Sequence, residues 1–183
     1  MFRLLNKIHR VGQVSESLAG DDLGNPDFEA VGSRLKEACG RWFQGSLAIR
    51  QVDAGSCNGC ELEIHALNNV YYSIEQYGIH FVASPRHADL LLVTGPVSRH
   101  MQAALLSAYA AMAEPKLVLA IGNCGVDGGE FGVSYASLGA VQNVIPVDGT
   151  IRGCPPTPLA LMRGILSIID REETGLNRKR EVK

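Results

Sequence analysis

Short apolar runs of strand length alternate with segments of helical character through most of this 183-residue chain. Strands that alternate with helices are typical of a parallel sheet that is covered by helices on both faces. The run at residues 116–122 is continuously apolar after its first residue, Lys116, as expected for a strand buried on both sides. We therefore predict an α/β fold with a doubly wound parallel sheet. The expected strands are residues 46–52, 79–83, 88–95, 116–122 and 141–148, and the expected helices are residues 60–76, 98–113 and 157–170.

The spacing of apolar residues predicts the buried face of two of these helices. In residues 157–170, Thr157 is placed to cap the helix and Pro158 to occupy its first position. The apolar stripe of this helix consists of Leu159, Met162, Ile165, Leu166 and Ile169. In residues 60–76, the i, i+4 spacing predicts a face formed by Leu62, Ala66, Val70 and Ile74.

The chain divides into three expected parts: an N-terminal arm over residues 1–45, an α/β domain over residues 46–171 and a charged tail over residues 172–183. The arm begins with apolar and cationic residues at helical spacing. This pattern predicts an amphipathic helix that docks on a partner or on the protein's own core, or that lies on an anionic membrane surface. Residues 15–33 are rich in Gly, Asp and Ser and predict a linker.

The charge balance and the lengths of the apolar runs argue against two classes of function. A formal net charge of −2 and a pI near 6.2 argue against a nucleic-acid partner, which normally requires a basic surface. No apolar run approaches the roughly 20 residues of a transmembrane helix, and the N-terminus lacks a secretory signal. We therefore expect a cytoplasmic location, where the five cysteines stay reduced and serve as ligands or bystanders.

Four of the five cysteines follow predicted strands. Cys57 and Cys60 come after the first strand, Cys124 follows residues 116–122, and Cys154 follows residues 141–148. In an open α/β sheet, ligands bind beyond the carboxyl ends of the strands. We therefore expect these four thiols, although distant in sequence, to converge on one point.

Four thiolates suit an iron–sulfur cluster or a structural zinc ion. Zinc modules usually pair their ligands locally, whereas Cys124 and Cys154 each stand alone, and glycines flank every one of the four cysteines. Glycine lets the backbone approach closely and aim N–H groups at cluster sulfurs. The pattern favours a [4Fe-4S] cluster, with zinc and a redox dithiol as alternatives.

Several motifs together resemble the small subunit of membrane-bound, energy-converting [NiFe] hydrogenases of the formate hydrogenlyase type, which is related to the cluster-bearing 20-kDa subunit of respiratory complex I. The resemblance covers about residues 47–170. The motifs that carry it are CNGCELE, SPRHADLLLVTGPVSR, AIGNCGVDGG and VIPVDGTIRGCPPTP.

This resemblance implies a flavodoxin-like fold and one proximal [4Fe-4S] cluster. The implied ligands are Cys57, Cys60, Cys124 and Cys154. The implied partners are a large subunit with a Ni–Fe centre, a ferredoxin-like iron–sulfur subunit and the membrane subunits of the complex. The implied location is peripheral, on the cytoplasmic side of the membrane. The Cys-x-x-Cys spacing is similar to that of the hydrogenases, whereas the complex I subunit has adjacent cysteines in this loop.

The resemblance also gives expectations for single residues. Glu63 matches an acid that the complex I relative keeps after its cysteines, which suggests a proton relay, whereas Glu61 is expected to be a solvated acid at the start of a helix. Cys39 lies outside every motif and is expected to be a free or buried thiol. Arg152 departs from the family pattern, in which an apolar residue and proline commonly precede the Gly-Cys pair, and it places a charge near the cluster.

The expected function is therefore electron transfer within an oxidoreductase complex, in which this chain is not catalytic alone. Its cluster would pass electrons between a Ni–Fe large subunit and a ferredoxin-like subunit. Two alternatives stay open at this point. One is a complex I-like module that delivers electrons to quinone or another acceptor, and the other is a zinc-stabilised flavodoxin-like interaction module.

Overall fold

The computed structural model of the chain describes residues 26–180 together with residues 6 and 9, and it describes side chains as far as Asp170. The predicted amphipathic helix therefore lies outside the described residues except at these two positions. The strands are β1 (Leu47–Asp53), β2 (Ile79–Phe81), β3 (Leu90–Thr94), β4 (Leu117–Ile121) and β5 (Gly149–Ile151). The helices are α2 (Pro26–Trp42), α3 (Gly59–Ala66), α4 (Gln102–Ala111), α5 (Gly122–Asp127) and α6 (Pro158–Arg180), with short 3-10 turns η2 (Ile74–Tyr77), η3 (Pro85–His87) and η4 (Val141–Asn143).

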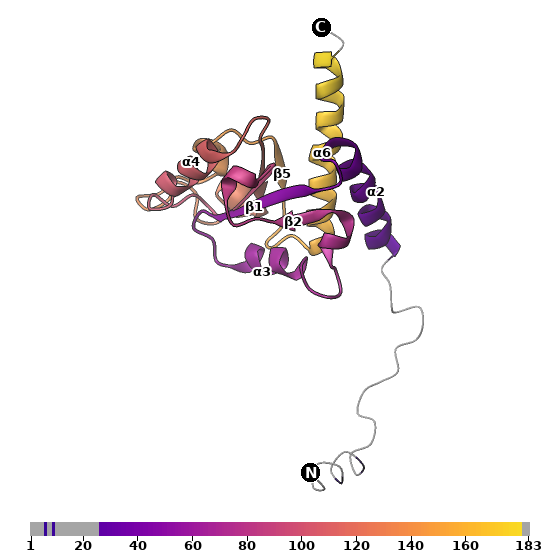
Figure 1. Cartoon of the computed structure of the whole chain (residues 1–183). Coiled ribbons are helices and arrows are strands. Elements are labelled where there is room, and N and C mark those ends of the chain that lie inside the picture. Colours follow the sequence, from indigo (N-terminus) through magenta and orange to yellow (C-terminus); the bar gives the residue numbers. More distant parts are fainter. Residues whose placement is uncertain (1–5, 7–8, 10–25, 181–183) are drawn as a thin grey trace.

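The five strands form one parallel sheet in the order β2-β1-β3-β4-β5. This is the order of a doubly wound, flavodoxin-like sheet. Successive residues of β3 and β4 enter two separate apolar cores, because neighbouring side chains of a strand point to opposite faces. In Figure 1, α2 and α6 lie side by side on one flank of the sheet and α4 lies at the far side. The predicted α/β fold is confirmed.

The start of α2 corrects the prediction of a linker, because residues 26–33 are helical. Pro26 occupies the first helical position, and apolar residues at helical spacing face the core. The buried residues of this face are Phe28, Val31, Leu35, Ala38 and Cys39. Gly32 sits where the ring of Tyr77 packs against the helix, so a side chain there would overlap the ring. This part of the expected arm thus belongs to the core of the α/β domain.

The helix expected over residues 60–76 is shorter than predicted, and it buries a different face from the predicted one. It ends at Ala66, where Asn69 opens a turn by accepting a hydrogen bond from the Tyr72 amide. Its buried residues are Glu61 and Ile64, whereas Leu62 is 62% exposed and Val70, beyond its end, is fully exposed. The i, i+4 spacing therefore predicted the wrong face of the helix itself, although Ile74 of the predicted set is buried beyond its end, in η2.

Two further boundaries differ from the prediction. Residues 141–148 begin with η4 and contain Pro146, which cannot donate to a strand ladder, so the strand starts only at Gly149. The last helix, α6, continues to Arg180, into the expected charged tail. None of the helices in the described part of the chain is long and apolar enough to span a membrane.

Candidate metal centre

The four cysteines that follow strands occupy loops at the carboxyl edge of the sheet. Cys57 and Cys60 lie between β1 and the first turn of α3, Cys124 lies in α5 directly after β4, and Cys154 follows β5. Burial raises the pKa of Cys60 to about 12, with further contributions from the charges of Glu61 and of the other three thiols. Gly122, two positions before Cys124, packs against Sγ of Cys60, and the Cβ position of Gly59 lies 4.0 Å from Pro155, which follows Cys154. The structure therefore brings the segments that carry the four cysteines together.

Two glycines let the backbone approach these sulfurs. A Cβ atom on Gly122 would lie 2.6 Å from Sγ of Cys60, and one on Gly129 would lie 2.7 Å from Sγ of Cys124. Both glycines also have left-handed φ angles, +76° and +51° respectively, which residues with a side chain rarely adopt. The absence of side chains at Gly122 and Gly129 therefore leaves free space beside the thiols, which we call the cradle.

The loop that carries Cys57 and Cys60 is shaped by Asp53 at the end of β1. Oδ1 of Asp53 accepts hydrogen bonds of 2.8 Å from the amides of Gly55 and Ser56, which is a local turn that aspartate favours. Gly95, in the loop after β3, packs so closely that a Cβ there would lie 2.5 Å from the Ser56 nitrogen. The loop is thus held by its own strand and by the neighbouring one.

The loops that carry Cys124 and Cys154 are joined directly to each other. The Asn123 amide donates to the Gly153 carbonyl at 2.9 Å, and the Gly153 amide donates to Oδ1 of Asn123 at 3.1 Å. The Arg152 guanidinium also donates to Oδ2 of Asp127 at 2.8 Å. The sequence analysis missed Asn123 and Asp127, because hydrogen bonds between loops that are distant in sequence leave no local pattern.

The site opens to solvent on one side, because Cys57 and Cys154 are exposed while Cys60 and Cys124 are half-buried. Burial raises the pKa of Cys124, and the charges of Cys154 and Cys57 raise it further. Thiols such as Cys60 and Cys124, whose ionisation burial disfavours, are stabilised as thiolates when they bind a cationic group.

Four cysteine thiols are a donor set that both zinc ions and iron–sulfur clusters use. Within the described residues, no three or more His, Cys, Asp or Glu side chains are grouped so as to hold one metal ion. Four ligands of one zinc ion must converge to about 2.3 Å from it. In a cluster each thiolate binds a different iron atom, so the ligands lie further apart. The donor set and the free cradle therefore fit a [4Fe-4S] cluster.

Of the two acids after Cys60, Glu61 differs from its expected environment. Glu61 is only 4% exposed, and neither carboxylate oxygen has a hydrogen-bond partner in the described part of the chain. Glu61 is thus not the solvated helix-start acid that was expected. Glu63 is half-buried. The structure places both acids on α3, next to the cysteine loop.

Other residues with reactive or exposed side chains lie outside the four cysteine positions. Cys39 is a free thiol of α2 that is fully buried, and this burial raises its pKa to about 11. Arg86 and His87 are exposed in η3. Phe131, Val133 and Tyr135 are exposed in the loop that follows α5, with Tyr135 93% exposed.

Comparisons with known proteins agree with this geometry. A family model described as "NADH ubiquinone oxidoreductase, 20 Kd subunit" matches residues 57–168, which include all four cysteines of the site. Formate hydrogenlyase subunit 7 of Escherichia coli (strain K12) is 41% identical over 74% of this chain, and the match covers 53% of that protein. The chain thus spans about half the length of this relative.

Two further matches cover most of the similar protein. The probable membrane-bound hydrogenase subunit mbhJ of Pyrococcus furiosus is 36% identical over 80% of this chain and 87% of its own length. A chain in the solved structure of the membrane-bound sulfane sulfur reductase, an archaeal respiratory membrane complex, is 35% identical. That match has a TM-score of 0.65 and covers 76% of this chain and 77% of the other. Similar folds therefore occur in complexes named for different reactions.

Proposed function

Because this chain belongs to the family of the 20-kDa subunit of NADH ubiquinone oxidoreductase, we propose that it is the electron-transfer small subunit of a membrane-bound hydrogenase. The observation that carries this proposal is the meeting of Cys57, Cys60, Cys124 and Cys154 at one edge of the sheet. These four thiolates would hold one [4Fe-4S] cluster. When bound, such a cluster stores and releases single electrons.

The contribution of this chain is to bind, bury and orient that group. Asp53 and the Asn123–Gly153 hydrogen bonds fix the loops that supply the four thiolates. Gly122 and Gly129 keep the space beside the sulfurs free of side chains. The buried side chain of Glu61 lies directly after Cys60, on the protein side of the site.

The exposure of Cys57 and Cys154 supports partners that cover the site. In the proposed complex, a large subunit with a Ni–Fe centre and a ferredoxin-like subunit lie on either side of the electron path. Membrane subunits would hold the assembly on the cytoplasmic side of the membrane. The family membership and the hydrogenase relatives support this arrangement.

Glu63 is the proposed carrier of protons near the interface with the large subunit. It follows the cysteine loop on α3 and is half-buried, so its side chain remains accessible from the surface. A relay needs a group that accepts and releases protons at working pH and that both sides can reach. Glu61 is harder to reach from the surface, because both of its carboxylate oxygens are buried.

A second candidate function is electron delivery to quinone or to another acceptor. The family description and the 35% identity to a chain of the sulfane sulfur reductase complex favour this candidate. In either case the chain performs the same electron transfer, and the partner decides the reaction.

The deciding experiment is anaerobic purification of the full chain together with the subunits that copurify with it. We expect at least four irons and four acid-labile sulfides per copy of this chain, with further iron from the partner subunits, together with the EPR signal of a reduced cluster and hydrogen-dependent dye reduction. Dye reduction by another donor, with the cluster present and no response to hydrogen, would favour the second candidate. Stoichiometric zinc without sulfide would refute both and leave the interaction module.

A further inference from the structure

The loops that carry Cys124 and Cys154, at the β4–β5 end of the sheet, are hydrogen-bonded directly to each other. The parallel ladder between these strands ends at the pair Ile121 and Ile151. Two residues further on, the reciprocal hydrogen bonds between Asn123 and Gly153 extend the connection beyond the strands. Each residue of this pair directly precedes a cysteine of the site. The positions of Cys124 and Cys154 are therefore tied to each other.

An ion pair closes this connection on the outer side. Arg152 donates to Oδ2 of Asp127 at 2.8 Å, while Oδ1 of the same carboxylate accepts from the Gly129 amide at 3.0 Å. Gly129 is the residue whose backbone lies against Sγ of Cys124. One carboxylate thus links the strand end before Cys154 to the backbone that surrounds Cys124.

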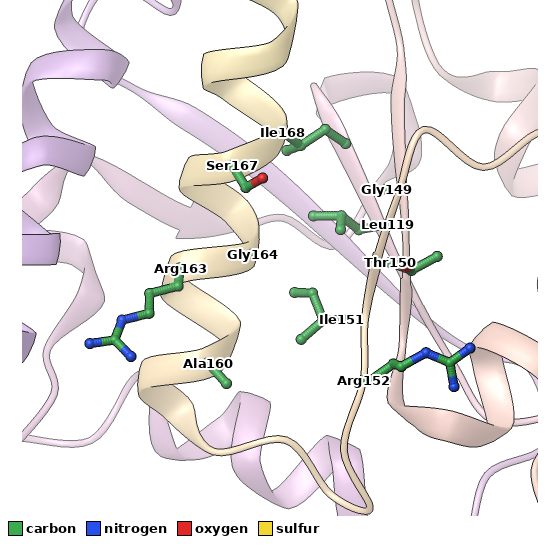
Figure 2. A pocket seen from close by; sticks show the side chains of 10 residues that line it. All are labelled: Leu119, Gly149, Thr150, Ile151, Arg152, Ala160, Arg163, Gly164, Ser167 and Ile168. Carbon is green, nitrogen blue, oxygen red and sulfur yellow. The ribbon is translucent and has the colours of Figure 1, made fainter.

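The guanidinium of Arg152 pairs with Asp127 and does not point into the neighbouring cavity (Figure 2). A cavity of about 310 Å³ lies between β5 and α6, and Arg152 and Arg163 belong to its lining. Figure 2 shows both guanidinium groups directed away from the cavity, on opposite sides. Arg163 pairs with Asp27 of α2, and Arg152 turns toward Asp127 of α5.

We propose that Asp127 and Arg152 are positioning residues which, with Asn123 and Gly153, clamp the Cys124 and Cys154 loops at the spacing that the cluster requires. This inference rests on the proposed function, because it assigns the clamp to the cluster of that function. Asp127 and Arg152 act through the loops, since neither is a ligand. The clamp matters most at Cys154, which is exposed and lies outside any helix or strand.

The expected effect of losing the ion pair is moderate. The side chains of Arg152 and Asp127 are 64% and 49% exposed, and pairs in such positions contribute little in water. We expect Arg152→Gln and Asp127→Asn each to speed cluster loss to EDTA by about two- to fivefold. Asn at position 127 keeps an acceptor for the Gly129 amide, so this variant removes the charge alone. The double variant should lose its cluster no faster than either single variant, because both remove the same contact.

The structure supplies a matched control pair. Arg34 and Asp170 form an ion pair of 3.3 Å with side chains that are 65% and 38% exposed, and this pair joins α2 to α6. Arg34→Gln removes a similar contact away from the cysteines and should leave the rate of cluster loss unchanged.

The test uses the full chain in its anaerobically purified complex and measures cluster loss, the EPR line shape and the reduction potential. We expect Arg152→Gln to broaden the EPR signal, because the two sulfurs then occupy a range of positions, and Arg34→Gln to leave it unchanged. If the wild-type complex holds its cluster and Arg152→Gln changes neither the rate of cluster loss nor the EPR signal, the clamp alone is overturned. A double variant, Arg152→Gln with Asp127→Asn, whose rate of cluster loss is the sum of the two single effects would also overturn it. A wild-type complex without iron and sulfide would overturn the proposed function and the clamp together.

Discussion

Gly122 at the start of α5 lies directly against the sulfur of Cys60, which comes from a loop on a different strand. A Cβ atom on Gly122 would be 2.6 Å from that sulfur, and the φ angle of +76° adds strain for any residue with a side chain. This glycine therefore joins the loop after β4 to the loop after β1 without filling the space between them.

Replacement of this glycine tests the cradle. We expect Gly122→Ala to lower the iron content strongly and to destabilise the chain by at least about 1 kcal/mol, because a left-handed φ penalises alanine. Iron analysis and thermal unfolding measure the two effects. Gly40→Ala is the matched control, because nothing lies within 4 Å of its Cβ position in α2, and it should be neutral or stabilising. Full iron content in Gly122→Ala would show that the cradle does not constrain the cluster.

Substitution of the four proposed ligand cysteines should remove the cluster, whereas substitution of the fifth cysteine, Cys39, should not. Each of Cys57→Ser, Cys60→Ser, Cys124→Ser and Cys154→Ser should lose the EPR signal of the cluster. Cys39→Ser should keep the iron and the signal, although its hydroxyl enters a fully buried position and should cost about 1–3 kcal/mol. Loss of the signal in Cys39→Ser with an unchanged melting temperature would contradict the ligand set.

The buried thiol of Cys39 should make the stability of the cluster-free chain fall at alkaline pH. Its pKa is raised by burial from about 9 to about 11, so the unfolded chain releases this proton first as the pH rises. The free energy of unfolding should therefore decrease between about pH 9 and pH 11. Urea unfolding of the cluster-free chain across this window measures the effect. Cys39→Ala should reduce the slope, and an identical slope in that variant would assign the effect to other groups.

The unpartnered carboxylate of Glu61 should cost stability. Both oxygens are buried without a hydrogen bond in the described part of the chain, which is unfavourable by about 1–3 kcal/mol for a polar group and more for a charged one. We expect Glu61→Leu to raise the melting temperature of the cluster-free chain and to change the reduction potential of the cluster. Glu75, exposed in η2, is the control position, where Glu75→Leu should not stabilise. A lower melting temperature in Glu61→Leu would mean that this acid has a stabilising partner.

Glu63 should matter for proton transfer and not for the cluster. Glu63→Gln keeps the size of the side chain but cannot carry a proton, so hydrogen production and hydrogen–deuterium exchange should fall about 100-fold. The EPR signal and the subunit composition should stay unchanged. Glu75→Gln, at an exposed position, serves as the control for both rates. Full activity in Glu63→Gln would place the proton path entirely in a partner chain.

The sequence by itself determined the fold class and the meeting of the four cysteines. Continuous apolar runs such as Leu117–Ile121 indicate strands that are buried on both faces, and the carboxyl ends of parallel strands share one edge. Any residue that directly follows such a strand must lie at that edge, whatever the details of packing. For this reason Cys57, Cys124 and Cys154 were placed correctly by their order along the chain.

The tertiary structure alone decided which side of α3 is buried and which residues join the ligand loops. A helix of eight residues makes about two turns, and its packing against α6 and the apolar core, not its own periodicity, selected Glu61 and Ile64 as the buried side. Asp127 and Arg152 stand 25 positions apart, and Asn123 and Gly153 stand 30 apart. Contacts of this kind form only after β4 and β5 have paired, because the ladder between these strands brings the two loops within hydrogen-bond distance.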